Sequence, residues 1–326
     1  MQAKQKNGMI LVWQCILSNI MKNRGWRKKL SRKKIVTILV IIIVIIGIIG
    51  FIVWKNLNKS NKQNDNTIKI VTSFYPMYIL AENITDGATN IELENMADVN
   101  VGCLHDYTLT TEDMKKLENA DIFISNGLGM ENFIDKAISA NQAMKIIDSS
   151  TNIQDLILHE DETNAHIWTS IEKYIEQVKN VSEGLKESNP ENAEIYEENA
   201  NNYIEKLEQL REKYLNELKN LQGKKAICLN EAFEYMGQEL GLEMTTVKTD
   251  HEESTMSAEM LKSIIDTAKE ENIEMIIVDK NDNRANAETI EQETGARIYE
   301  LNSGLSGSME KDEYVKAIEE NLQLLK

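Results

Sequence analysis

The chain has 326 residues, 42% of them hydrophobic and 6% aromatic, an ordinary composition for a globular protein of about two domains. Of its 36 basic residues, 13 lie in residues 1–66 with one of the 53 acidic residues, which leaves 23 basic and 52 acidic residues for residues 67–326. This strongly acidic body would repel phosphates, which argues against a nucleic-acid partner.

The longest apolar segment, residues 35–54, has 20 residues and no charge. As a helix with a rise of ~1.5 Å per residue it would span ~30 Å, the thickness of the hydrocarbon core of a bilayer. Eight Lys/Arg precede it from Lys22 to Lys34, whereas only Lys55, Lys59 and Lys62 follow it. By the positive-inside rule, residues 1–34 are cytoplasmic and the body is extracellular.

We therefore predict a basic cytoplasmic segment (1–34), a single-pass signal-anchor helix (35–54) that holds the protein in the cell membrane, and a polar linker (55–66), in a Gram-positive-type arrangement. A late-cleaved signal is the alternative, and Met21 is a second possible translation start before the anchor. With Cys15 before the anchor, at most one disulfide, Cys103–Cys228, can form outside.

Strands and helices are expected to alternate from Thr67 onward. Buried apolar runs predict strands at 68–71, 91–96, 121–125 and 145–148, and helices are expected at 77–85 and from Thr110 or Thr111 to Asn119. Thr111, Glu112 and Asp113 are typical of a helix start, and Asn126-Gly127 of a turn. This alternation favours a parallel sheet of βαβ units.

The pattern changes at about residue 170, where helical periodicity replaces the strands. An amphipathic helix is expected over 172–187, followed after Pro190 by one of ~32 residues over 190–221. Its apolar stripe consists of Tyr196, Ala200, Tyr203, Leu207, Leu210, Tyr214, Leu218 and Leu221. A coiled coil is the alternative, but a rigid connector between two α/β regions fits the context better.

Strand–helix alternation resumes after Gly223. Strands are expected at 225–229, 243–247, 275–278 and 297–301, and helices at 232–240, 257–271, 287–294 and 310–325. The predicted fold is thus α/β: two α/β lobes with parallel-rich sheets, at 67–170 and 223–326, joined by linking helices at 171–222 with one long backbone helix, after an N-terminal transmembrane helix.

Four histidines can carry chemistry: His105, His159, His166 and His251. His105 follows a predicted strand, and ligands of open α/β sheets gather at the carboxyl ends of strands. His166 immediately precedes a predicted helix. His159 lies in a short acidic stretch, which we interpret as a solvated loop with a weak ion-collecting role as the alternative.

Several ordered motifs resemble those of the zinc/manganese-type solute-binding proteins of metal ABC importers, known as cluster A-I. The motifs are Val71-Thr72-Ser73-Phe74-Tyr75-Pro76, His105-Asp106-Tyr107 with Asp113, Ala120-Asp121 with Asn126-Gly127 and Glu131, His166-Ile167-Trp168, Glu231-Ala232-Phe233 with Tyr235, and Leu301-Asn302. The resemblance covers about 80% of the chain. It implies a monomeric binding protein, not an enzyme, that carries zinc or manganese in a cleft between two lobes and works with an ABC permease.

The resemblance places four metal-ligand positions at His105, His166, Asn230 and Asn302. The last two are amides where family members have stronger ligands, and a neutral amide oxygen is a weak ligand for zinc. Glu231, adjacent to Asn230, is the first candidate to replace it, and His251 is another. Cys103 and Cys228 could also take part as ligands, because each lies two residues before a ligand position and in extended backbone points to the same side as that ligand. Cys228 fits better as a small buried apolar residue of a strand.

Two other functions remain possible at this point. A degenerate family member with amide-weakened ligands could be a surface interaction or sensor protein that no longer transports metal. A hydrolytic metalloenzyme is disfavoured because the sequence has no HExxH or GxSxG motif.

Overall fold

The computed structural model describes residues 67–326 except residues 106, 134, 137, 138, 140, 160, 161 and 248–255. The predicted cytoplasmic segment, anchor and linker therefore lie outside the described residues, as does His251. Among the residues that are described, no helix is both long enough and apolar enough to cross a membrane.

The first half of the body forms a four-stranded sheet in the order β2-β1-β3-β4, in which every pair is parallel. The strands are β1 (Ile68–Thr72), β2 (Ile91–Asn95), β3 (Ile122–Ser125) and β4 (Lys145–Asp148). Helices α3 (Tyr75–Thr85) and α4 (Thr111–Asn119) connect them. The expected α/β fold is confirmed here. The helix start expected at Thr111 is capped one residue earlier, by Thr110, whose side chain forms a reciprocal capping box with Asp113.

The second half forms another four-stranded parallel sheet, in the order β10-β9-β7-β8. Its strands are β7 (Lys225–Cys228), β8 (Glu243–Thr246), β9 (Met275–Asp279) and β10 (Arg297–Leu301). A 3₁₀ turn η4 (Glu231–Phe233) and the helices α8 (Glu234–Leu240), α9 (Ala258–Glu271) and α10 (Ala285–Thr294) lie between them. The lobe boundaries at 170/171 and 222/223 stay predictions.

Helices α6 (Ile171–Ser188) and α7 (Ala193–Glu217) lie between the two sheets in sequence and pack against each other. Helix α6 also covers β4, where Gly184 permits the close approach, because a Cβ there would lie 2.8 Å from Ile147 Cγ2. The predicted stripe of α7 is buried from Tyr196 to Tyr214. This burial indicates that packing of the apolar stripe, more than the helix propensity of its residues, stabilises the helix.

The prediction of one helix over 190–221 was too long. The α-helix has 25 residues and lies between two 3₁₀ turns, η2 (Pro190–Asn192) and η3 (Lys219–Leu221). Asn192 leaves helical geometry because its side chain pairs with the main chain of Thr89, accepting from the N–H at 2.9 Å and donating to the carbonyl at 2.9 Å. This contact between residues 103 positions apart ends the helical run at its N-terminal side.

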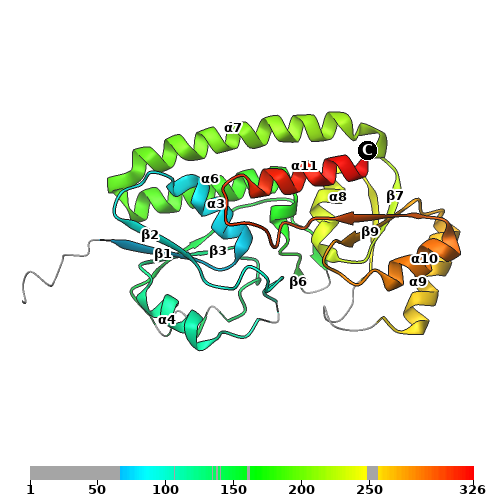
Figure 1. The fold of residues 1–326 in the computed structure, drawn as a ribbon, viewed down its shortest axis with the longest axis horizontal. Coiled ribbons are helices and arrows are strands. Elements are labelled where there is room, and N and C mark those ends of the chain that lie inside the picture. The colour runs from blue at the N-terminus through cyan, green and yellow to red at the C-terminus, as the bar shows by residue number, and fades with distance from the viewer. Residues whose placement is uncertain are drawn as a thin grey trace, which may run out of the picture. The chain divides into compact units, whose positions relative to one another are not determined.

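The last helix, α11 (Glu313–Leu325), returns from the second sheet to the first half of the body. It packs against β10, α7 and α3, and Figure 1 shows it running beside α7. The Tyr75 hydroxyl donates to the Ser308 carbonyl (2.6 Å), and the Tyr314 hydroxyl donates to the Trp168 carbonyl (2.9 Å). One continuous hydrophobic core therefore includes residues of both sheets and of α7.

Candidate metal site

His166 is buried at the point where the chain enters a short 3₁₀ turn, η1 (Ile167–Thr169). The turn after β3 positions this segment, because the Asn126 amide donates to the Ala165 carbonyl (2.9 Å). The carboxylate of Glu131 stabilises the turn after β3 by accepting hydrogen bonds from the N–H groups of Asn126 and Gly127. The sequence motif Asn126-Gly127 with Glu131 thus fixes the backbone beside His166.

The ring of His166 is oriented by Asn164, a residue that the sequence did not single out. His166 Nδ1 lies 2.9 Å from Asn164 Oδ1. The Asn164 NH2 group donates to the Glu231 carbonyl (3.0 Å) and to Glu234 Oε2 (2.6 Å), so its oxygen must face the imidazole. Nδ1 is therefore the protonated nitrogen, and the lone pair is on Nε2.

His166 is also held neutral. Burial, and secondarily the nearby His105, lowers the pKa of His166 to about 3. Its ring packs against Trp168 with centroids 5.1 Å apart. A neutral, oriented imidazole with its lone pair on Nε2 is the form that binds a divalent metal.

His105 lies on the loop before α4, and its ring centroid is 5.3 Å from that of His166. The loop is tied to α4 by Tyr107, whose hydroxyl donates to Asp113 Oδ2 (2.7 Å). His105 Nε2 is buried and makes no hydrogen bond to any residue in the described part of the chain. A buried ring nitrogen without a partner costs free energy, so a ligand for it would stabilise this loop.

Glu231, the first residue of η4, lies beside both imidazoles. Its Oε1 is 4.0 Å from His105 Nε2 and 3.8 Å from His166 Nδ1, and its side chain is 34% exposed. At these distances it makes no hydrogen bond to either ring. It does bring a carboxylate from the second half of the body to the two histidines of the first half.

The two predicted amide ligands have other partners. Asn230 Oδ1 accepts from Ala232 N–H (3.0 Å) and so caps η4, while its Nδ2 donates to Asp282 Oδ2 (3.0 Å). Asparagine is a favoured cap because its short side chain reaches these N–H groups. The amide of Asn230 is therefore used within the second half of the body.

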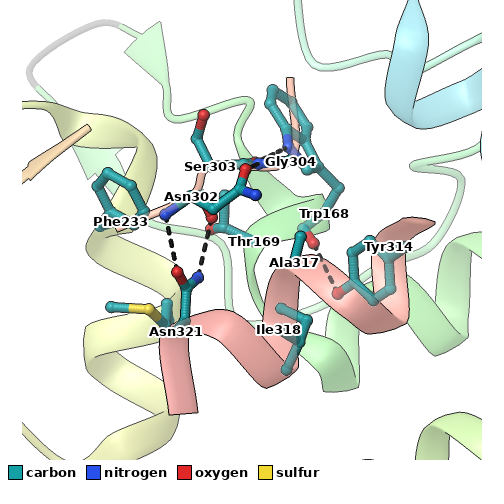
Figure 2. Close-up of a pocket in the computed structure, with 11 residues that line it drawn as sticks. Trp168, Thr169, Phe233, Asn302, Ser303, Gly304, Tyr314, Ala317, Ile318 and Asn321 are labelled. Atoms are coloured by element: carbon teal, nitrogen blue, oxygen red, sulfur yellow. Dashed lines mark hydrogen bonds between the residues drawn. The ribbon is translucent and has the colours of Figure 1, made fainter. Parts of the chain in front are cut away.

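The polar groups of Asn302 likewise hydrogen-bond to neighbouring residues of the second half of the body (Figure 2). Its Oδ1 accepts from Gly304 N–H (3.0 Å), and its main chain pairs with the Asn321 side chain at 2.7 and 2.9 Å. Its Nδ2 donates to Glu320 Oε2 (3.0 Å). Asn302 lines a cavity of about 10 Å³ with Phe233, Trp168 and Tyr314. This volume holds at most one water molecule, so the pocket is a packing feature.

The two cysteines of the body lie in different surroundings: Cys103 beside His166, and Cys228 beside the main chain of Asn230. Cys103 Sγ lies 3.3 Å from His166 Nε2, and Cys103, His105 and His166 offer ligand atoms that all lie within 4.8 Å of one another. Cys228 is buried and donates to the Asn230 carbonyl (2.7 Å), and burial raises its pKa to about 12. Neither Cys103 nor Cys228 is in a disulfide, so the bridge that the sequence allowed is not formed.

His159 belongs to a small hairpin of β5 (Leu158–His159) and β6 (Glu162–Thr163) that the sequence did not predict. Its Nε2 is 2.5 Å from Glu234 Oε2, the same oxygen that accepts from Asn164. The interpretation as a freely solvated loop was therefore wrong at His159, whose side chain is only 21% exposed. Glu234 stabilises Asn164, and Asn164 orients His166.

Residues 70–326 match the family model of ZnuA, the periplasmic zinc-uptake complex component A. The chain belongs to this family. It is 29% identical over 283 residues to the high-affinity zinc uptake system protein ZnuA of Bacillus subtilis, a match that covers 79% of this chain and 86% of that protein. It is 26% identical over 288 residues to the zinc-binding lipoprotein AdcA of Streptococcus pneumoniae, covering 82% of this chain but 57% of the longer AdcA.

Three solved structures agree with the fold. The SBP FpvC of Pseudomonas aeruginosa in complex with Ni²⁺ has a TM-score of 0.72 at 25% identity, covering 79% of this chain and 95% of FpvC. FpvC in complex with Mn²⁺ has the same TM-score and identity. A crystal structure of ZnuA has a TM-score of 0.68 at 25% identity, covering 79% of this chain and 98% of that chain.

Proposed function

We propose that this chain is the extracytoplasmic metal-binding component of an ABC importer and that zinc is the ion it carries. The observation that supports this most strongly is the pair of imidazoles, His105 and His166, whose ring centroids are 5.3 Å apart in a family of zinc-uptake components. His105 Nε2 is buried and has no hydrogen-bond partner among the described residues, and His166 Nε2 carries a lone pair. Imidazole nitrogen favours zinc over the oxygen-preferring manganese ion.

In this proposal the third ligand is Glu231 rather than Asn230 or Asn302. The carboxylate is charged and is already within 4.0 Å of both rings, whereas both amides are engaged elsewhere. Its partial exposure leaves room for the rotamer change that would bring Oε1 to the ~2.0–2.2 Å of a zinc–oxygen bond. Ligands from both halves of the body would make zinc binding hold the two halves together.

The proposal is tested by titrating the purified, metal-stripped full chain with zinc and with manganese against a competing chelator. We expect one zinc ion per molecule, bound more tightly than manganese. If neither ion binds below micromolar concentration, the proposed function is wrong, and a surface interaction or sensor protein that has lost transport becomes the better interpretation.

A single substitution tests whether Glu231, rather than the acidic surface in general, contributes to zinc affinity. Glu231→Gln keeps the size of the side chain but replaces a charged ligand by a neutral amide, so zinc affinity should fall by about 10–100-fold or more. The matched control is Glu271→Gln, which changes an exposed carboxylate of α9. Equal zinc affinities of the two variants would remove Glu231 from the ligand set.

We further propose that the protein acts as a monomer, that residues 35–54 tether it to the outer face of the cell membrane, and that an ABC permease receives its ion. The support for the tether is the length of the apolar run and the flanking charge. Release of the intact full chain from isolated membranes by an alkaline carbonate wash would contradict the tether and leave the metal site untouched.

A further inference from the structure

A buried thiol lies beside Nε2 of His166, the ring nitrogen that carries the lone pair. Cys103 is 8% exposed, and its Sγ lies 3.3 Å from His166 Nε2 and 3.5 Å from Met130 Sδ. Since Nδ1 donates to Asn164, Nε2 is the nitrogen on which an ion would be bound. The sulfur therefore stands beside the coordination position itself.

The spacing matches what two ligands of one ion require. With a zinc–sulfur bond of ~2.3 Å and a zinc–nitrogen bond of ~2.0–2.1 Å at a tetrahedral angle, the two ligand atoms lie about 3.5 Å apart. The observed 3.3 Å is within a few tenths of that value. The third member of the cluster, His105, has its ligand atom within 4.8 Å of both. Small side-chain movements are therefore enough to converge all three on one ion.

We propose that Cys103 binds the ion as a thiolate, together with His105, His166 and Glu231. This inference rests on the proposed function and deepens it. When the zinc–sulfur bond forms, the thiol proton passes to solvent and no electron is transferred. The resulting set is tetrahedral, with two imidazoles, one thiolate and one carboxylate. It replaces the weak amide ligands that Asn230 and Asn302 would supply. Cys103 would thereby determine specificity, because a thiolate selects zinc and disfavours manganese.

The direct test is spectroscopic and uses the full chain. Cobalt(II) bound to the metal-stripped protein should give a near-ultraviolet sulfur-to-cobalt charge-transfer band. The band should be lost in Cys103→Ser and kept in Cys228→Ala, which removes the other buried thiol. Cys103→Ser should also weaken zinc binding by about 100-fold or more, which exceeds the loss expected for a residue that only hydrogen-bonds to a ligand. Manganese binding should be weakened less.

X-ray absorption of the zinc-loaded wild-type chain needs no variant and so does not depend on how Cys103→Ser folds. A zinc–sulfur distance of ~2.3 Å supports the inference. If zinc is bound with nitrogen and oxygen neighbours alone, or if Cys103→Ser keeps wild-type zinc affinity, the inference is overturned while the proposed function stands. If the wild-type chain binds neither zinc nor cobalt, both are overturned.

Discussion

Replacing His166 by alanine is expected to reduce zinc affinity by about 10²–10³-fold. Apparent binding free energies of zinc sites with four protein ligands are about 10–16 kcal/mol, which is about 2.5–4 kcal/mol for each ligand. His166 should contribute in full, because it is buried and neutral and because its ring is already oriented by Asn164. Competitive titration of His166→Ala with zinc, beside the wild-type chain, measures the loss.

The matched control for this prediction is His159→Gln. His159 belongs to the same hydrogen-bond network through Glu234, but it lies two partners away from the ring of His166. Glutamine keeps a donor for Glu234, so we expect a change of less than about tenfold, below the cost of losing a direct outer partner. If His166→Ala retained zinc as tightly as the control, the ion would be held elsewhere in the protein.

Trp168→Ala is expected to lower the free energy of unfolding by about 3–5 kcal/mol. The indole is fully buried, packs edge-on against Phe74 with centroids 5.1 Å apart, and donates to the Ser303 carbonyl (2.9 Å). Removing it would leave a cavity between the two halves of the body and an unpaired carbonyl. For a body of this size the change corresponds to a fall in Tm of about 10 °C, measurable by circular dichroism on the metal-free protein.

Trp168→Phe separates the two causes of that loss. Phenylalanine retains most of the apolar volume but cannot donate to Ser303, so about 1–3 kcal/mol should be lost. A Trp168→Ala variant that is destabilised by less than its Trp168→Phe counterpart would contradict the assignment of Trp168 as a principal contact between the halves.

The strands were the most predictable part of the fold. Runs such as Ile122–Ser125 and Met275–Asp279 are buried on both faces of a parallel sheet, and that burial produces continuous apolar sequence. The N-terminal end of the long helix was less predictable. It depends on Asn192, whose side chain bonds to Thr89 across 103 residues, and no local pattern contains that contact.

The site was predictable only in part. The resemblance pointed to His105 and His166, and the structure brings their rings together. Asn230 carried a signal that favoured another role, since an asparagine immediately before a helical turn is a typical cap. No comparable signal existed for Asn302, which pairs with Asn321, a residue 19 positions away. The spacing of Cys103 from His105 placed its thiol on the side of the ligands, but the approach of that thiol to His166 joins residues 63 positions apart and could not be read from any local pattern.

The return of α11 to the first half of the body has a consequence for how the protein is made. Tyr75 and Asn83 on α3 bond to the carbonyls of Ser308 and Lys311, across sequence separations of 233 and 228 residues. During synthesis the N-terminal elements emerge first, so α3 must wait for nearly the entire chain before its last partners arrive. Until then the part of α3 that these C-terminal segments cover stays accessible to chaperones and proteases, and a chain that stops before α11 leaves part of α3 uncovered. Loss of the C-terminal helix is therefore expected to weaken the packing of the first half of the body as well as that of the second.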